Sequence, residues 1–220
     1  MCIICVSKKG VRQPNETEIR TMFSRNPHGA GYMVAEPNGV RIEKGFMTVK
    51  ELLHALRQEN FTPDDVVVYH FRISTQAGVC EEMTQPFPLC ENIELLKCWH
   101  SVCDCGIAHN GIIPCTTFYD ETEYSDTALF VSFYLTELVK GNADLKDQKV
   151  LDKIEKMIHS KMVLLDKTGY IAIIGNFVEH DGLLFSNYTF EKKKQNYFTF
   201  EDVKRWRKVV GLDAELQGVK

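Results

Sequence analysis

The second residue of the chain, Cys2, could act as a nucleophile that carries its own base. If Met1 is removed, Cys2 bears a free α-amine with a pKa of about 7.7–8.0 beside a thiol with a pKa of about 8.5. An amine next to a nucleophile can accept its proton, so one residue would supply both groups. The plainer explanation of Cys2 is an ordinary strand residue, and the chemistry therefore depends on partners elsewhere in the sequence.

Two charged residues could bind charged groups of a ligand. Arg72 follows the apolar run 66–69, and a guanidinium at the end of a buried strand can grip a carboxylate with two hydrogen bonds. Asp126, between Ser125 and Thr127, precedes an apolar segment and could face an ammonium group from a helix start. The alternatives are a surface salt bridge for Arg72 and a helix N-cap at Ser125, and the N-cap is compatible with ligand binding.

The tripeptide His109-Asn110-Gly111 follows a short apolar segment. A side-chain amide and a glycine N–H at a strand end can both donate hydrogen bonds to a developing oxyanion. The alternative is a hairpin, because Asn-Gly is the commonest two-residue hairpin turn.

A second kind of site is suggested by soft side chains gathered within twelve residues: Cys98, His100, Cys103, Cys105 and His109. Zinc sites usually pair two Cys-x2–4-Cys motifs across a longer loop, and a single strand cannot close a tetrahedron of ligands. The stretch also has the pattern of a strand that runs up to His109. We therefore expect core packing of reduced thiols, with no bound metal and no cofactor.

Composition limits the class of protein. The chain has 220 residues, of which 44% are hydrophobic and 25% charged, and its formal net charge is −4. This charge disfavours a broad electrostatic surface for nucleic acid or anionic membranes. The sequence has no charged n-region followed by a long apolar segment, so we expect a cytoplasmic protein without a membrane span.

The elements that must position these residues are strands with helices between the strand groups. Period-two and short apolar patterns predict strands at 3–6, 32–35, 40–44, 66–73, 106–109, 162–165, 170–174 and 183–186, with hairpin turns at 167–169 and 181–182. Helices are predicted from a capping box at Thr48 and Glu51, over about 126–139 with Gly141 closing it, over about 148–160, and from Thr199. This order favours one α+β domain over residues 1–220.

The order and spacing of the candidate residues resemble a known family. Cys2, Arg72 with Thr75, Asn110-Gly111 and Asp126 resemble the motifs of class II glutamine amidotransferases, which are glutaminase domains of the N-terminal-nucleophile hydrolase superfamily. The early segment with Arg25 and residues 29–31 is similar to that family's Arg…Ala-Gly motif, and residues 181–187 resemble its short stand-alone bacterial and phage versions.

The resemblance implies a four-layer αββα sandwich and a role for each motif residue. Cys2 would be the nucleophile, and Asn110 and Gly111 would hold the oxyanion. Arg72 would bind the substrate α-carboxylate and Asp126 its α-ammonium. Thr75 and His109 would belong to the substrate-binding residues. The implied reaction is hydrolysis of glutamine to glutamate and ammonia.

The chain departs from the family at Met83 and Gln85, where the stand-alone versions have Asn and His before Pro-Phe. Its length leaves no room for a synthase domain, so a separate protein would accept the ammonia. Two alternatives remain: a free-standing amidohydrolase of a γ-glutamyl compound, and a catalytically decayed binding or regulatory homologue. Met1 bears on the two enzymatic possibilities, because their mechanism needs Cys2 at the amino terminus.

Overall fold

The computed structural model describes residues 1–74, 78–116 and 123–191. The strands are β1 (Ile3–Ser7), β2 (Ala30–Glu36), β3 (Gly39–Phe46), β4 (Val67–Phe71), β5 (Phe87–Pro88), β6 (His100–Cys103), β7 (Cys105–Asn110), β8 (Lys161–Asp166), β9 (Ile171–Ile174), β10 (Val178–His180) and β11 (Leu183–Phe185). The helices are α1 (Glu16–Arg25), α2 (Val49–Glu59), α3 (Asp126–Phe130), α4 (Thr136–Leu138) and α5 (Gln148–Ile158). Short 3-10 turns cover Ile93–Lys97, Pro114–Thr116 and Asp144–Lys146.

The strands of the described ranges form two antiparallel sheets. The larger has seven strands in the order β10-β11-β1-β4-β2-β3-β6, and the smaller has four in the order β5-β7-β8-β9. Strand β1 lies inside the larger sheet, where Ile3 pairs with Phe71 of β4 and Cys5 pairs with Phe185 of β11. The residue before β1 is Cys2, so its backbone is held at a sheet end by strands on both sides.

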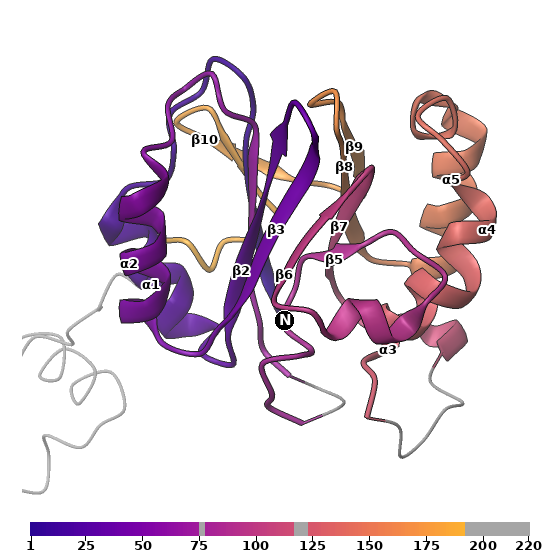
Figure 1. Ribbon diagram of the computed structural model, residues 1–220, viewed down its shortest axis with the longest axis horizontal. Helices are drawn as coiled ribbons and strands as arrows, with labels where there is room; N and C mark the ends of the chain where they lie inside the picture. Colours follow the sequence, from indigo (N-terminus) through magenta and orange to yellow (C-terminus); the bar gives the residue numbers. More distant parts are fainter. Residues whose placement is uncertain (75–77, 117–122, 192–220) are drawn as a thin grey trace, which may run out of the picture.

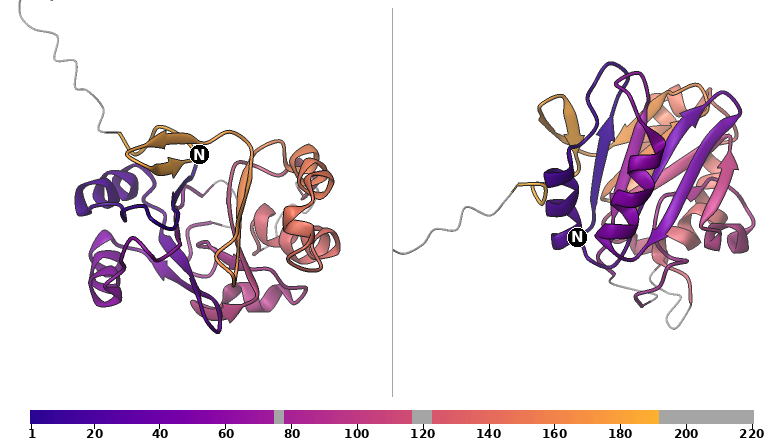
Figure 2. Two further views of the ribbon diagram at one scale, coloured as in Figure 1. Left: turned by 90° about the horizontal axis from the view of Figure 1, so that it is seen from above. Right: turned by 60° about the vertical axis from the view of Figure 1, so that its left-hand side comes forward.

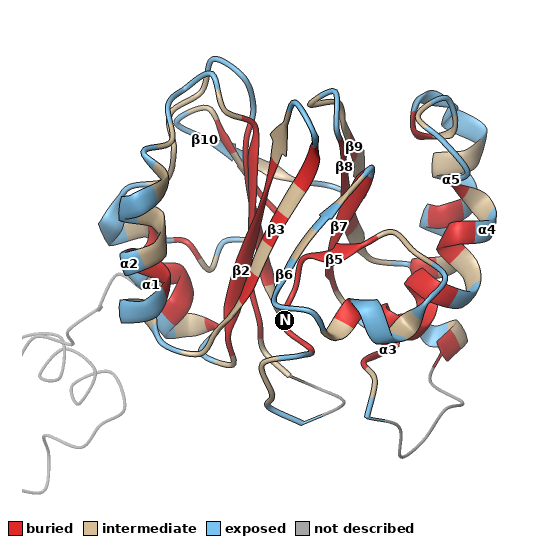
Figure 3. Cartoon of the chain, in the orientation of Figure 1, coloured by how far each residue is buried: buried red, intermediate tan, exposed pale blue. Residues whose placement is uncertain are grey.

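The two sheets pack against each other through their apolar faces (Figure 1). Ile4 and Met33 of the larger sheet share a buried cluster with Ala108 and Val163 of the smaller one. Helices α1 and α2 pack on the other face of the larger sheet, and α3 to α5 cover the smaller sheet (Figures 1 and 2). Buried residues follow both sheets, while the outward faces of the helices are exposed (Figure 3). Antiparallel sheets with few helices agree with the expected α+β class.

Capping boxes fix the start of the two helices on the larger sheet. The predicted box at α2 is confirmed, because Thr48 and Glu51 bond each other's backbone N–H groups. Helix α1 was not predicted, although Asn15 and Glu18 form the same reciprocal pair. None of the helices in the part of the chain that is described is long and apolar enough to cross a membrane.

The helix expected over 126–139 is interrupted. Residues Val131–Leu135 form a π-helical turn between α3 and α4, and Val139 has an extended backbone. Gly141 does not close this helix, which corrects the prediction: its N–H donates to Asp144 Oδ2 at 3.1 Å in the following loop. Helix α5 ends at Ile158, because His159 takes a left-handed conformation.

The stretch around Cys98–Cys105 is two strands in different sheets, and the prediction of one strand running up to His109 is wrong. Strand β6 pairs with β3 in the larger sheet, whereas β7 pairs with β5 and β8 in the smaller one. Local pattern cannot reveal this division, because both halves have strand character. The turn at Asp181-Gly182 is confirmed by positive φ at both residues between β10 and β11. The helix expected from Thr199 lies outside the described residues.

Candidate active site

Cys2 is held at the start of β1 by backbone and side-chain contacts. The Ile73 N–H donates to Cys2 Sγ at 3.3 Å, and the thiol lies 3.5 Å from the Ile73 carbonyl oxygen. Asn187 Nδ2 donates to the Cys2 carbonyl at 2.6 Å. Since Ile3 pairs with Phe71, the antiparallel register places Cys2 opposite Arg72.

A small pocket opens beside the Cys2 thiol. Its lining includes five of the residues that the sequence singled out: Cys2, Arg72, His109, Gly111 and Asp126. Ile73, Ser74, Gln85, Ser125 and Thr127 complete it. The free volume is about 20 Å³, room for about one water molecule. A larger ligand therefore requires movement of the lining side chains.

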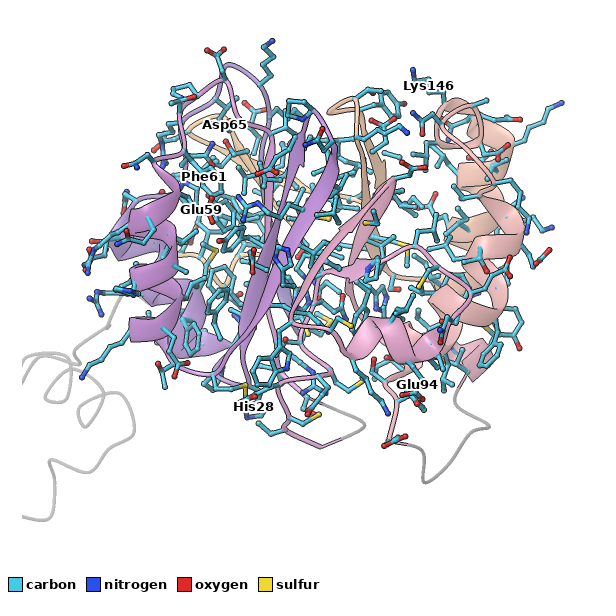
Figure 4. The ribbon with its side chains drawn as sticks, in the orientation of Figure 1. His28, Glu59, Phe61, Asp65, Glu94 and Lys146 are labelled. Carbon is cyan, nitrogen blue, oxygen red and sulfur yellow. The ribbon has the colours of Figure 1, made fainter. Side chains whose placement is uncertain are left out.

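Two of the predicted site residues are not part of this lining. Asn110 is buried at the end of β7, directly before Gly111 of the lining, and its side-chain amide contacts Ser186. Thr75 lies outside the described residues. Beside it, the Ser74 N–H donates to His28 Nδ1 at 2.9 Å, and His28 lies at the lower edge of the ribbon in Figure 4.

The electrostatics of the pocket link the thiol to both charged residues. Burial raises the pKa of Cys2, whereas the Ile73 hydrogen bond, the positive amino terminus and Arg72 lower it. Burial also lowers the pKa of Arg72, and the negative charge of Asp126 opposes that effect. Arg72 is only 4% exposed, so it is not the surface salt bridge that was the alternative prediction.

Asp126 is fixed at the first turn of α3. Ser125 is the N-cap, as predicted, since its Oγ accepts from the Ala128 N–H at 3.2 Å. The Asp126 carboxylate accepts from the N–H groups of Thr127 at 2.7 Å and Ile113 at 2.8 Å. Oδ2 is oriented by one backbone bond and keeps a lone pair for a cation, whereas Oδ1 also lies 3.3 Å from the Thr127 hydroxyl.

His109 is held as a neutral imidazole. The Ser160 hydroxyl donates to the Ile158 carbonyl at 2.9 Å, so Ser160 Oγ accepts from His109 Nε2–H at 2.7 Å. His109 Nδ1 then accepts from the Thr127 hydroxyl at 2.9 Å. Burial lowers the pKa of His109 to about 4, although Asp126 opposes this. Because both ring nitrogens are engaged, His109 is not free to accept a proton from a thiol.

Several residues that shape the site were not identified from the sequence. Gln85, noted only as a departure from the family, accepts from the His109 N–H through Oε1 at 2.7 Å. Ser160 and Ser186 are buried or half-buried hydroxyls that contact His109 and Asn110. Lys44 is buried and donates to the backbone carbonyl of Thr84, the residue before Gln85. Lys44 and Ser160 have no local sequence signal. Ser186 lies in the segment 181–187 that resembles the family, but the sequence assigned it no role because its partners are distant in the chain.

The cysteine-rich stretch does not converge on a common centre. All eight cysteines are free thiols. Cys98 is exposed, while Cys105 is buried in the smaller sheet. Across residues 1–74, 78–116 and 123–191, no group of three or more His, Cys, Asp and Glu side chains is arranged to hold a metal ion.

Comparison with known proteins identifies the fold. No protein-family model matches the chain, and no curated protein matches it in sequence. A solved structure of glutamine phosphoribosylpyrophosphate (PRPP) amidotransferase from B. subtilis, complexed with ADP and GMP, resembles it with a TM-score of 0.50 and 14% identity. The match covers 84% of this chain and 42% of that one. The chain therefore shares the fold of part of an amidotransferase enzyme and spans less than half of its length.

Proposed function

We propose that this protein is a class II glutamine amidotransferase domain that hydrolyses the amide of glutamine with Cys2 as its N-terminal nucleophile. The observation that carries the proposal is the pocket in which the Cys2 thiol lies with Arg72, Asp126 and Gly111. The packing of helices on the outer faces of two stacked sheets supports the four-layer αββα sandwich of N-terminal-nucleophile hydrolases. A cytoplasmic location is part of the same proposal.

The charges of the pocket suit an amino-acid head group. Arg72 would bind the α-carboxylate, and Asp126, oriented by two backbone N–H groups, would bind the α-ammonium. One fixed cation and one fixed anion are what a zwitterion requires. Thr75 and His109 complete the substrate-binding residues of the proposal, and we assign His109 to the pocket wall, where it faces the ligand as a neutral ring.

The reaction requires that Met1 be removed so that Cys2 carries the α-amine. Met1 is 76% exposed and therefore accessible to an aminopeptidase. The thiol proton passes to the α-amine, and Cys2 Sγ bonds to the carboxamide carbon of glutamine. The resulting oxyanion accepts hydrogen bonds from Asn110 Nδ2 and the Gly111 N–H. The base is assigned to the amine because both ring nitrogens of His109 are engaged in hydrogen bonds and burial lowers the pKa of His109 to about 4.

The tetrahedral intermediate then collapses. The C–N bond breaks, and the α-ammonium of Cys2 returns its proton to the leaving nitrogen. That nitrogen departs as ammonia, and the glutamyl group remains bound to Cys2 as a thioester. Water loses a proton to the α-amine as it adds to the thioester carbon. The C–S bond breaks, the thiolate takes that proton back, and glutamate is released.

An intact-mass experiment tests the proposal. Protein purified from its native host should lack one methionine and gain a single adduct at Cys2 when incubated with a glutamine-analogue diazoketone. Excess glutamine should prevent the adduct, and Cys2→Ala should not form it. Retention of Met1 in protein from that host contradicts the mechanism and favours the binding-protein alternative.

The proposal has two versions, which differ in whether the released ammonia passes to a separate acceptor protein. A glutaminase that serves a separate synthase should favour glutamine, whereas a free-standing amidohydrolase should favour a γ-glutamyl compound with a larger leaving group. Both use the same head-group residues, Arg72 and Asp126. Comparing kcat/KM for glutamine with that for γ-glutamyl amides of increasing size distinguishes them.

A further inference from the structure

Ser186 connects the strand of the nucleophile to the oxyanion residue. Its Oγ accepts from the Ile4 N–H at 2.9 Å, and it lies 2.9 Å from the side-chain nitrogen of Asn110. The Ser186 backbone N–H also donates to the Ile4 carbonyl at 2.9 Å. Ser186 is completely buried, so no solvent competes for these bonds. One hydroxyl thus contacts β1, two residues after Cys2, and the end of β7.

The hydrogen bonds of this hydroxyl define how the Asn110 amide is best oriented. With Nδ2 toward Ser186, the hydroxyl accepts two hydrogen bonds, and Asn110 Oδ1 is buried without a partner among the described residues. In the opposite orientation, Ser186 accepts from the Ile4 N–H and donates its own proton to Oδ1. Both oxygens are then satisfied, and the amide nitrogen alone lacks a partner.

We propose that Ser186 is a positioning residue that holds the Asn110 amide with Oδ1 bound and Nδ2 free to donate to the oxyanion. This inference rests on the proposed function, in which Asn110 supplies one of the oxyanion donors. A buried amide nitrogen without a partner is costly in the resting protein, and it gains that partner only when negative charge develops on the substrate oxygen. Ser186 therefore acts on the tetrahedral intermediate and not on binding of glutamine itself.

The same contact explains how two sheets present one site. Cys2 belongs to the larger sheet, and Asn110 belongs to the smaller one. Ser186 bonds the backbone of β1 and the side chain at the end of β7. The neighbouring Asn187 holds the Cys2 carbonyl. Residues 186–187 thus fix the nucleophile and the oxyanion donor relative to each other.

A double-mutant cycle tests this role. Ser186→Ala should lower kcat for glutamine about 10-fold, less than the 10²–10³-fold typical of removing an oxyanion donor, and leave KM close to its original value. In an Asn110→Ala background, Ser186→Ala should have no further effect on kcat, because the group it orients is gone. Ser132→Ala, which removes a buried hydroxyl from the π-helical turn, is the matched control and should leave kcat unchanged.

A ligand that forms a tetrahedral adduct gives a second readout. The γ-aldehyde analogue of glutamate adds to the Cys2 thiol and places its oxygen where the oxyanion forms. Ser186→Ala should weaken binding of this aldehyde about 10-fold, while binding of glutamate, which keeps a trigonal carbon, should not change. Ser186→Cys keeps the volume of the side chain and replaces the hydroxyl with a weak donor, so it should show the same pattern if the alanine variant is unstable.

The outcomes separate this inference from the proposed function. If Ser186→Ala lowers kcat equally in both backgrounds, or weakens glutamate and aldehyde alike, Ser186 has only a structural role and the inference is wrong. If Asn110→Ala leaves the kcat of an active enzyme unchanged, the assignment of the oxyanion donor is wrong, and this inference with it. A protein processed at Met1 that forms no Cys2 adduct and releases no ammonia contradicts the proposed function instead.

Discussion

The Nε2–H of His70 donates to the backbone carbonyl of His109 across 3.0 Å and links the two sheets next to the site. His70 lies in β4, two residues before Arg72, and His109 precedes Asn110 in β7. A carbonyl can only accept, so His70 carries its proton on Nε2. Burial lowers the pKa of His70 to about 3 and that of His109 to about 4. Both histidines at this contact are therefore neutral, although only the His70 ring takes part in it, because His109 contributes its backbone carbonyl.

We predict that acid destabilises the protein through these two residues. The folded-state pKa values lie below the ordinary value of 6.5, so the unfolded chain binds more protons between about pH 6.5 and pH 3–4. The free energy of unfolding should fall as pH falls through that window, by up to about 1.4 kcal/mol per pH unit for each group. Denaturant unfolding from pH 7 to pH 4 measures it.

The control for this prediction is an exposed histidine. His70→Gln keeps a donor for the His109 carbonyl and removes the titrating group, so its stability should vary less with pH than that of the original protein. His180→Gln, at an exposed position, should not change the slope. Equal slopes in all three proteins would show that His70 is not buried as a neutral ring.

Sequence patterns were sufficient for the central strands and for the starts of α2 and α3. The apolar run at residues 162–165 and the turn residues Asp181-Gly182 act locally, so the sequence alone is enough to predict them. The edge strand β10 was missed because it is short and largely exposed, and β6 was not distinguished from β7. The division of the chain between sheets at Asp104 depends on distant partner strands, which local patterns do not encode.

The residues of the candidate site also fall into two groups, those that the sequence predicts and those that it does not. Cys2, Arg72 and Asp126 have chemically distinctive side chains, and the structure brings them to one pocket. Ser160 and Ser186 have no such signal, since a serine acquires its role only from the groups that folding brings to it. Gln85 also has no signal for its role, because in the sequence it is only a departure from the family pattern. In the structure its side-chain oxygen accepts a hydrogen bond from the His109 backbone N–H.

The head-group assignment predicts a dependence on the substrate ammonium. Asp126→Asn should lower kcat/KM for glutamine by the equivalent of about 2–5 kcal/mol, because it leaves a desolvated ammonium without its anion. With glutaramate, which is glutamine without its α-amino group, the same substitution should have little effect. Steady-state kinetics with both substrates measures this.

The exposed residue Asp64 provides the matched control. Asp64→Asn should leave both substrates unaffected. If Asp126→Asn lowers kcat/KM equally for glutamine and glutaramate, the carboxylate only stabilises the start of α3 and the Ile113 N–H and does not bind the ligand.

Lys44 is predicted to stabilise the segment that carries Gln85. Its ammonium is buried and donates to the carbonyls of Glu82 at 2.5 Å, Thr84 at 3.0 Å and Leu96 at 2.5 Å. Burial lowers the pKa of Lys44 to about 7, while the nearby groups of Cys98, Cys80 and Glu82 oppose this shift. Lys44→Met leaves these carbonyls buried without a donor and should cost about 2–4 kcal/mol.

Denaturant unfolding measures the loss of stability. The same substitution at an exposed lysine, Lys50→Met, is the control. Because Gln85 directly follows Thr84, Lys44→Met should also raise KM for glutamine in the fraction that remains folded. A Lys44→Met protein as stable as the original would refute the assignment, since it would mean that the carbonyls find other donors.

Gly111 is predicted to be irreplaceable because of Ser160. Its φ is +155°, and a Cβ at this position would lie 2.3 Å from Ser160 Cβ and 3.3 Å from His109 Nε2. Gly111→Ala should therefore displace the backbone N–H assigned to the oxyanion and lower kcat about 10²–10³-fold.

Removing the obstructing atom tests the cause: Ser160→Gly should recover part of the stability lost in Gly111→Ala, whereas Ser160→Ala keeps the Cβ and should recover none. Gly141→Ala, where no atom lies within 4 Å of the added Cβ, should be tolerated and serves as the control. Thermal unfolding and kcat of these variants decide between steric conflict at Ser160 and backbone strain alone, because strain at φ +155° would leave both double variants equally impaired.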